Sequence, residues 1–261
     1  MSDSNRDTAL PKGAALVTGA ADRVGAAIAE RLAVEGYPVI IHYRSSAEAA
    51  AAVCERILEA GGRAAQVQAD LERRSDRAGL IRTAAKAFGP IAVLVNNASL
   101  YEPDAACDVD EKLWDSHFAL HAEAPVFLTR DFAAQLPPEM AGNIINIIDE
   151  RVLRPSPAYL SYSLSKSVLW TATQTLAQSL APQIRVNAIG PGPVLPHMKQ
   201  TQDQFEAAVR NLPLKRHADP KAIADGVMFL LSAYAMTGQM LALDGGRHLE
   251  YPARRGPTPR Q

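Results

Sequence analysis

Cysteine is scarce in this chain of 261 residues, which carries only Cys54 and Cys107. Two cysteines in this arrangement offer neither a metal-binding spacing nor a disulfide framework, so a small disulfide-stapled fold is excluded. The scarcity favours a reducing compartment. We expect both residues to be small apolar side chains of the core rather than ligands.

The chain also lacks an excess of charge of either sign, with 27 Lys and Arg against 28 Asp and Glu. No global electrostatic field would collect nucleic acid or an anionic membrane surface, so we expect neither partner. Long apolar runs are missing too, and the N-terminus MSDSNRDTALPKG has no apolar segment before a cleavage site. These absences predict a cytoplasmic protein without a membrane span.

Hydrophobic residues make up 48% of the chain, enough for one sizeable core. Short β-rich runs alternate with longer helical stretches, and this alternation predicts βαβ crossovers. We expect one α/β domain of the Rossmann type, doubly wound, with a seven-stranded parallel sheet and helices on both faces. The expected strands are Ala14–Thr18, Val39–His42, Ala64–Gln68, Ile91–Val95, Asn143–Ile148, Arg185–Ala188 and Met240–Leu243. The expected helices are Gly25–Glu35, Ala47–Ala60, Ser75–Phe88, Asp110–Leu136, Tyr159–Leu180 and Pro220–Leu231.

Both ends of the chain are polar and rich in Pro, Arg and Ser. Residues 1–12 and 252–261 are therefore expected to be flexible tails, and residues 13–251 to form the single domain. Ligands of such a sheet bind outside the carboxyl ends of its strands. Motifs at strand ends are consequently the candidates for function.

The first expected strand runs into a glycine-bearing turn, from Thr18 to Gly25, and a helix follows. The helix N-terminus offers free N–H groups and a partial positive charge to a pyrophosphate, and glycine lets the backbone approach it. An ordinary strand-to-helix turn without a ligand can have a similar sequence. The position after the first strand of a βαβ unit favours dinucleotide binding.

The second expected strand ends at His42, followed by Tyr43, Arg44, Ser45 and Ser46. An NAD site needs an acidic residue here for the ribose 2′-hydroxyl, whereas a guanidinium and hydroxyls bind a 2′-phosphate. The basic and hydroxyl side chains after this strand predict NADPH as the cofactor. The alternative is that Arg44 is only a solvated surface charge.

Tyr162 and Lys166 are four residues apart on an expected helix and so share one face. A phenol with an ordinary pKa near 10 exchanges its proton at neutral pH only when a nearby positive charge stabilises the phenolate. Lys166 can supply that charge, so the two residues form a candidate proton-donating pair. The same spacing also occurs by chance on many helices.

Several separate motifs resemble the signatures of short-chain dehydrogenases/reductases: Thr18-Gly19, Gly25, Asn96-Asn97-Ala98 and Tyr162-Ser163-Leu164-Ser165-Lys166. The resemblance covers about Ala14 to Leu249. It implies a homotetramer, a substrate lid at about 191–214, and a carboxylate at Asp70 for the adenine amino group. Without the resemblance, Asp70 could equally close a turn. The implied cofactor-binding residues are Gly19, Arg23, Val24, His42, Tyr43, Arg44, Ser45, Asp70, Leu71, Asn97, Ala98, Ser99, Lys166, Pro191 and Gly192.

Two departures from the general family pattern are similar to pteridine reductases and bacterial dihydromonapterin reductases. Arg23 stands where the family usually has a glycine, and Asp149 ends the fifth expected strand where most members have serine. The resemblance implies an Asp149–Tyr162–Lys166 catalytic set, with Arg23 facing the phosphates and the pterin. Asp149 could instead cap a helix or close a turn. An ionised carboxylate accepts hydrogen bonds from amino and ring N–H donors, which a simple ketone lacks.

Tyr101 lies where pteridine reductases carry an aromatic ring that stacks on the pterin, although it could also be a core tyrosine. The ending Leu243–Leu249 is similar to that of dihydromonapterin reductases. His121 lies where many relatives place an asparagine that anchors a proton-relay water, so it could relay protons or simply pack in the core. The expected substrate-binding residues are Arg23, Ser99, Tyr101, Asp149 and Tyr162.

These observations predict an NADPH-dependent reduction of a dihydropterin, of the dihydromonapterin, dihydrobiopterin or dihydrofolate type, with no metal ion. One alternative is a carbonyl reductase acting on 3-oxoacyl thioesters, which requires Asp149 to tolerate a carbonyl oxygen. The other is an NADPH-binding regulator without turnover. The Tyr162–Lys166 pair argues against the last alternative, because a sensor needs no proton donor.

Overall fold

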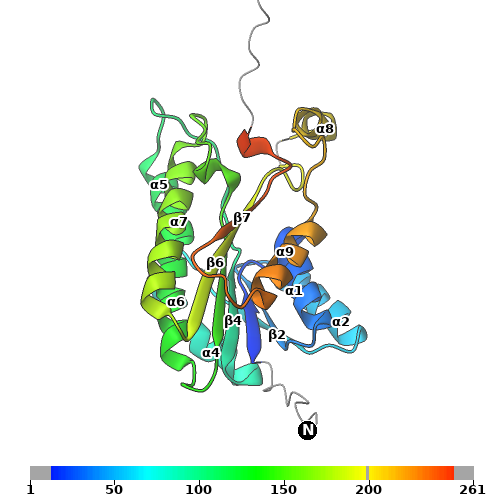
Figure 1. Cartoon of the computed structure of the whole chain (residues 1–261), viewed down its shortest axis with the longest axis vertical. Helices are drawn as coiled ribbons and strands as arrows, with labels where there is room; N and C mark the ends of the chain where they lie inside the picture. The colour runs from blue at the N-terminus through cyan, green and yellow to red at the C-terminus, as the bar shows by residue number, and fades with distance from the viewer. Residues whose placement is uncertain (1–12, 198–199, 250–261) are drawn as a thin grey trace, which may run out of the picture.

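The computed structural model describes residues 13–197 and 200–249, and both expected tails lie outside these residues. Within them, a single parallel sheet of seven strands has the order β3-β2-β1-β4-β5-β6-β7 (Figure 1). The expected doubly wound α/β domain is therefore confirmed. The strands are β1 (Ala14–Val17), β2 (Val39–Tyr43), β3 (Ala64–Gln68), β4 (Ile91–Asn96), β5 (Gly142–Ile147), β6 (Ile184–Pro191) and β7 (Met240–Leu243).

Helices cover both faces of the sheet (Figure 1). One layer holds α1 (Arg23–Val34), α2 (Ala47–Glu59) and α9 (Pro220–Ser232). The other holds α4 (Leu80–Phe88), α6 (Ala124–Gln135) and α7 (Leu160–Leu180). The remaining elements are α3 (Arg74–Arg77), α5 (Glu111–Phe118), α8 (Gln202–Arg210) and the short turns η1 (Ala119–Glu123), η2 (Glu150–Val152) and η3 (Arg247–Leu249). No helix among the described residues combines the length and apolar character needed to cross a membrane.

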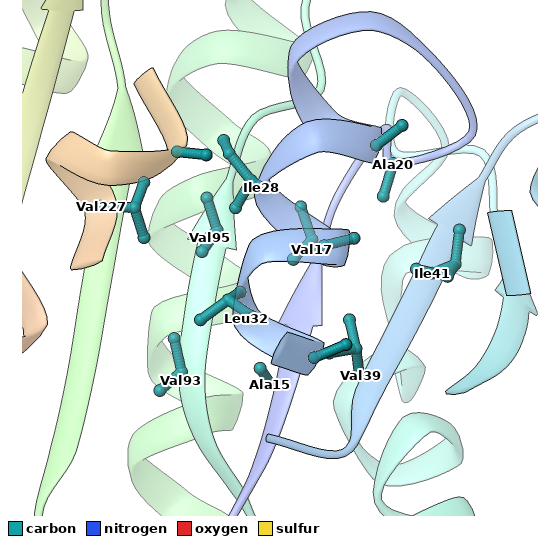
Figure 2. Packing of buried hydrophobic residues seen from close by; sticks show 14 of the residues in the cluster. Ala15, Val17, Ala20, Ile28, Leu32, Val39, Ile41, Val93, Val95 and Val227 are labelled. Carbon is teal, nitrogen blue, oxygen red and sulfur yellow. The ribbon is translucent and has the colours of Figure 1, made fainter. Parts of the chain in front are cut away.

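Strand β1 is buried along its whole length and contributes side chains to both layers of the core. Ala15 and Val17 face α1, α2 and α9, while Leu16 faces the opposite layer. Figure 2 shows Ile28 and Leu32 of α1 packed over the sheet beside Val17. Each fully buried aliphatic side chain contributes about 1.5–3 kcal/mol, so the position of α1 over β1 is strongly fixed.

The order of strands in the sheet changes direction at β1. Strands β2 and β3 are added on one side of β1, and β4 then pairs with its other side. Loops that leave β1 and β4 at their carboxyl ends therefore diverge to opposite faces and leave a crevice between them.

Three sequence-based expectations are corrected. The expected helix Ser75–Phe88 is broken into α3 and α4, because Gly79 adopts a φ of +89°. The expected irregular lid contains the helix α8, which begins with a capping box of Thr201 and Gln204. Cys107 is exposed and is not part of the core.

Candidate active site

A cavity of about 1010 Å³ opens at the carboxyl ends of the central strands. It brings together most of the residues singled out in the sequence: Gly19, Arg23, Val24, His42, Arg44, Asp70, Leu71, Asn97, Ala98, Ser99, Tyr101, Asp149, Tyr162, Lys166, Pro191 and Gly192. Two expected cofactor residues are not among its lining. Tyr43 packs half-buried against the core beneath α1 and α2, and Ser45 is exposed beyond the end of β2.

The loop between β1 and α1 forms the floor of one end of the cavity. A side chain at Gly25 would place its Cβ 2.2 Å from the carbonyl oxygen of Gly19, and Gly19 itself has a φ of +60°. Both positions therefore require glycine. Asp22 makes no side-chain cap to α1, so the first N–H groups of this helix are left for a ligand.

Asn97 and Thr18 tie this loop to the end of β4. The Asn97 side-chain amide donates to the carbonyl oxygens of Thr18 and Gly19, at 2.9 and 3.0 Å. The Thr18 hydroxyl oxygen accepts from the backbone N–H groups of Asn97 and Ala98. Asn97 thus shapes the wall of the cavity. The role of Thr18 was not anticipated, although its place before Gly19 is visible in the sequence.

His42 lies under the cavity and is only 2% exposed. The Gly19 N–H donates to its Nδ1 at 3.1 Å, so Nε2 carries the proton and donates to the carbonyl oxygen of Ala69, at 3.1 Å. Burial lowers the pKa of this imidazole to about 4, against a weaker raising effect of the bond to Ala69. His42 is therefore a neutral link between the ends of three strands.

Arg44 lies at the end of β2 with a side chain that is 61% exposed. Its guanidinium donates to the Glu72 carboxylate at 2.8 Å. The Glu72 N–H in turn donates to Asp70 Oδ1 at 3.1 Å, so Asp70 does close a turn. Glu72 was missed in the sequence, because nothing along the chain marks it as the partner of a residue on another strand.

The Tyr162 hydroxyl donates to Asp149 Oδ2 at 2.8 Å. The other oxygen, Oδ1, accepts from the backbone N–H of Arg151 at 2.9 Å and caps the turn η2. Asp149 thus combines the cap with a contact to the phenol. The Lys166 ammonium donates to the carbonyl oxygen of Ile147 at 2.9 Å and lies 5.7 Å from the centre of the Tyr162 ring.

The three pKa values of this cluster follow from burial and from Asp149. Burial, followed by the Asp149 carboxylate, raises the pKa of Tyr162 well above 10. Burial raises the pKa of Asp149, against the lowering effects of Arg151 and Tyr162. Burial also lowers the pKa of Lys166 to about 8, which the Asp149 charge partly offsets. Lys166 was expected to favour the phenolate, whereas burial and the Asp149 carboxylate hold the phenol in its protonated form.

Tyr101 forms one wall of the cavity. Its ring stacks on Tyr159 with centres 4.4 Å apart, and its hydroxyl accepts from Arg151 Nη2 at 2.7 Å. The Arg151 guanidinium also lies 4.6 Å from the centre of the Tyr159 ring. Arg151 and Tyr159 were missed in the sequence, because only the fold brings the segment after β5 against the loop after β4.

The segment after β6 lines the cavity and is hydrogen-bonded to two other loops. His197 Nε2 donates to the carbonyl oxygen of Tyr101 at 2.9 Å. Arg23, which adopts a φ of +50°, donates to the carbonyl oxygen of Pro196 at 3.2 Å. Arg23 and the backbone of Tyr101 thus hold the segment after β6 in place.

Comparison with known proteins places this geometry in a family. The family model described as enoyl-(acyl carrier protein) reductase matches residues 19–248. The structure is similar to FolM alternative dihydrofolate reductase 1 from Brucella canis complexed with NADP, at 47% identity and a TM-score of 0.90, covering 94% of this chain and 96% of that one. A short-chain type dehydrogenase/reductase of Picea abies is 34% identical, and the match covers 89% of this chain and 91% of that protein. A 3-oxoacyl-[acyl-carrier-protein] reductase of Synechocystis is 32% identical, and the match covers 92% of this chain and 98% of that protein. The predicted resemblance is confirmed, and the chain belongs to the short-chain dehydrogenase/reductase family.

Proposed function

We propose that this protein is an NADPH-dependent reductase of dihydropterins. The observation that carries the proposal is the hydrogen bond between Tyr162 and the Asp149 carboxylate on the floor of the cavity. A carboxylate accepts from the amino and ring N–H groups of a pterin but offers a ketone oxygen no donor when ionised. The similarity to the Brucella canis protein named an alternative dihydrofolate reductase supports the same substrate class.

The cavity fits a dinucleotide at the end formed by the first loop. Glycines 19, 25 and 192 are required by close packing of the backbone at this end of the cavity, since a Cβ at Gly192 would lie 2.7 Å from the Cα of Asp244. The unsatisfied N–H groups of α1 suit a pyrophosphate. Arg44 suits a 2′-phosphate, and the structure of the Brucella canis relative contains NADP. These features support NADP(H) as the cofactor.

When bound, NADPH supplies a hydride, which adds to C6 of the 7,8-dihydropterin. As the C6=N5 double bond becomes single, N5 takes a proton from the Tyr162 hydroxyl, either directly or through a water that this hydroxyl orders, and the product is a tetrahydropterin. The Lys166 ammonium offsets the negative charge left on the phenolate until solvent restores the proton. Asp149 and Arg23 orient the ring, and the wall at Tyr101 and Ser99 confines it.

The test is NADPH oxidation by the purified protein with dihydrobiopterin, dihydromonapterin, dihydrofolate and an acetoacetyl thioester in parallel. A higher kcat/KM for a dihydropterin or dihydrofolate than for the thioester supports the proposal. A preference for the thioester overturns it in favour of a 3-oxoacyl-thioester reductase, the second candidate, which the similarity to the Synechocystis protein favours. If NADPH binds but is not oxidised with any of these substrates, the remaining candidate is an NADPH-binding regulator without turnover.

The homotetramer also stays a proposal. Leu164 and Val168 are exposed at 42% and 43% on one face of α7, and contact with a second copy of the chain would cover them. Light scattering after size-exclusion chromatography measures the oligomeric state. A monomer at working concentration would contradict the proposed tetramer and leave the proposed reaction untouched.

A further inference from the structure

His121 projects into the molecule from a defect in a long helix. The chain between α5 and α6 forms the π-helical turn η1, and His121 is 1% exposed. The cause is visible in the sequence, because Pro125 has no N–H to donate to the carbonyl oxygen of His121 as an α-helix would require. The wider turn directs the imidazole between the loop after β4 and helix α7, which it joins by hydrogen bonds.

The hydrogen bonds of His121 define its protonation state. The Leu100 backbone N–H donates to Nε2 at 3.1 Å, so Nε2 carries no proton. The Ser165 hydroxyl donates to the carbonyl oxygen of Tyr162 at 2.8 Å, so its oxygen must accept at 2.9 Å from His121 Nδ1. The imidazole is therefore neutral, with its proton on Nδ1. The Ser99 hydroxyl, 3.0 Å from Nε2, can only donate to it.

The surroundings of His121 oppose a positive charge on the ring. Burial lowers its pKa well below 6.5, and the charges of Lys166 and His117 lower it further. The His117 ring stacks at 5.5 Å, and the Tyr162 ring lies edge-on at 5.3 Å. Among the residues that the structure describes, no carboxylate lies close enough to raise its pKa. Taking up a proton would also break the bond from Leu100.

We propose that His121 is a positioning residue, which fixes the substrate-side loop Ser99–Tyr101 to the helix that carries Tyr162, and that its imidazole neither takes up nor releases a proton during turnover. Nε2 holds the loop through Ser99 and Leu100. Nδ1 holds the helix one turn from the phenol through Ser165. This assignment rests on the proposed site but not on the identity of the substrate.

Nitrogen-15 NMR of the histidine side chains tests the tautomer without any turnover. His121 should show the neutral form protonated at Nδ1 from about pH 5 to pH 8, with and without NADPH. His42 is an internal control, because Gly19 donates to its Nδ1 and it must show the opposite tautomer. A titration of His121 within this range, or a proton on Nε2, would overturn the proposal.

Two variants separate positioning from proton transfer. His121→Phe removes both bonds, whereas His121→Gln keeps one acceptor and one donor on neighbouring atoms. The Phe variant should expose the Leu100 amide to faster hydrogen exchange and raise KM for dihydrobiopterin about tenfold. It should leave the NADPH Kd and the pH profile of kcat unchanged, and the Gln variant should restore KM and exchange protection.

His217→Gln serves as the matched control. Among the described residues, the His217 imidazole hydrogen-bonds to the neighbouring carbonyl oxygen of Ala218 and packs edge-on against Phe205 at 5.1 Å, so it ties neither the loop Ser99–Tyr101 nor α7. A loss of one limb of the pH profile in the Gln variant, with KM unchanged, would show that His121 moves protons. Should the Phe variant fail to fold, the NMR tautomer of His121 and the KM and pH profile of the Gln variant still distinguish positioning from proton transfer. If no pterin is reduced at all, the exchange and tautomer measurements test His121 independently of the proposed function.

Discussion

The Tyr162 hydroxyl and the Asp149 carboxylate share a hydrogen bond of 2.8 Å at the bottom of the cavity. The carboxylate disfavours a neighbouring phenolate, whereas the hydrogen bond from the phenol favours the ionised carboxylate, and burial disfavours both charges. The phenol is thereby kept protonated before the substrate arrives. A proton donor that is loaded at neutral pH is what a reduction requires.

Replacing Tyr162 by phenylalanine removes that donor. We expect kcat with dihydrobiopterin to fall by about 10²–10⁴-fold, the range for a general acid. The NADPH Kd, measured by fluorescence titration, should stay near the parent value, because the phenol serves proton transfer. Turnover close to that of the parent would mean that the proton reaches N5 from another group.

The pH dependence of kcat should report Lys166. Burial lowers its pKa from 10.5 to about 8, so the ammonium is present below this pH and is lost as the pH rises through it. We therefore expect kcat to fall on the alkaline side near pH 8. In Asp149→Asn this limb should move to lower pH, because the carboxylate is the group that raises the lysine pKa. An alkaline limb that does not move in the Asn variant would contradict this assignment.

Much of the site could be predicted because its motifs follow strands. Parallel strands that end at one edge of a sheet bring Gly19, Asn97 and Asp149 together without any knowledge of side-chain contacts. The pairings between these segments could not be predicted. Arg44 with Glu72, and Arg151 with Tyr101, depend on distances across the fold that no spacing along the chain encodes.

The missed helix α8 has a different cause. Its start signal, Thr201 with Gln204, is present in the sequence, but Phe205 is the only buried residue within the described helix. The segment is polar on average and follows Pro193 and Pro196, so it was expected to be irregular although its few apolar residues recur at helical spacing. His42 was singled out by its place at a strand end, but its hydrogen bonds to Gly19 and Ala69 could not be predicted, because both partners follow other strands.

Arg44 should determine cofactor preference. Arg44→Ala should weaken NADPH binding by about 1.5–3 kcal/mol, or roughly ten- to hundredfold, through the lost charge-assisted contact with the 2′-phosphate. NADH binding is the control and should hardly change. Because Glu72 competes for the guanidinium in the free protein, Glu72→Gln should tighten NADPH binding. Equal NADPH affinities in the parent and Arg44→Ala would contradict the role.

His42 should make the fold sensitive to acid. Its pKa is about 4 in the folded protein against an ordinary value of 6.5, so the unfolded chain binds the extra proton and stability falls as the pH drops between these values. From pH 7 to pH 5 this linkage costs about 2 kcal/mol. His42→Gln can keep both hydrogen bonds and should lose about that much less over the same interval. Urea unfolding of both proteins at the two pH values measures the difference, and identical losses would contradict it.

Asp149→Ser separates the two candidate substrates most sharply. Serine leaves a hydroxyl that can donate to a carbonyl oxygen but removes the charge that accepts from pterin N–H groups. Activity on dihydropterins should therefore fall by about tenfold or more, the loss expected for a charge-assisted hydrogen bond. Activity on small ketones should not fall with it. The measurement is paired kcat/KM at fixed NADPH. An unchanged value on dihydropterin would remove the basis of the pterin proposal and leave a general reductase.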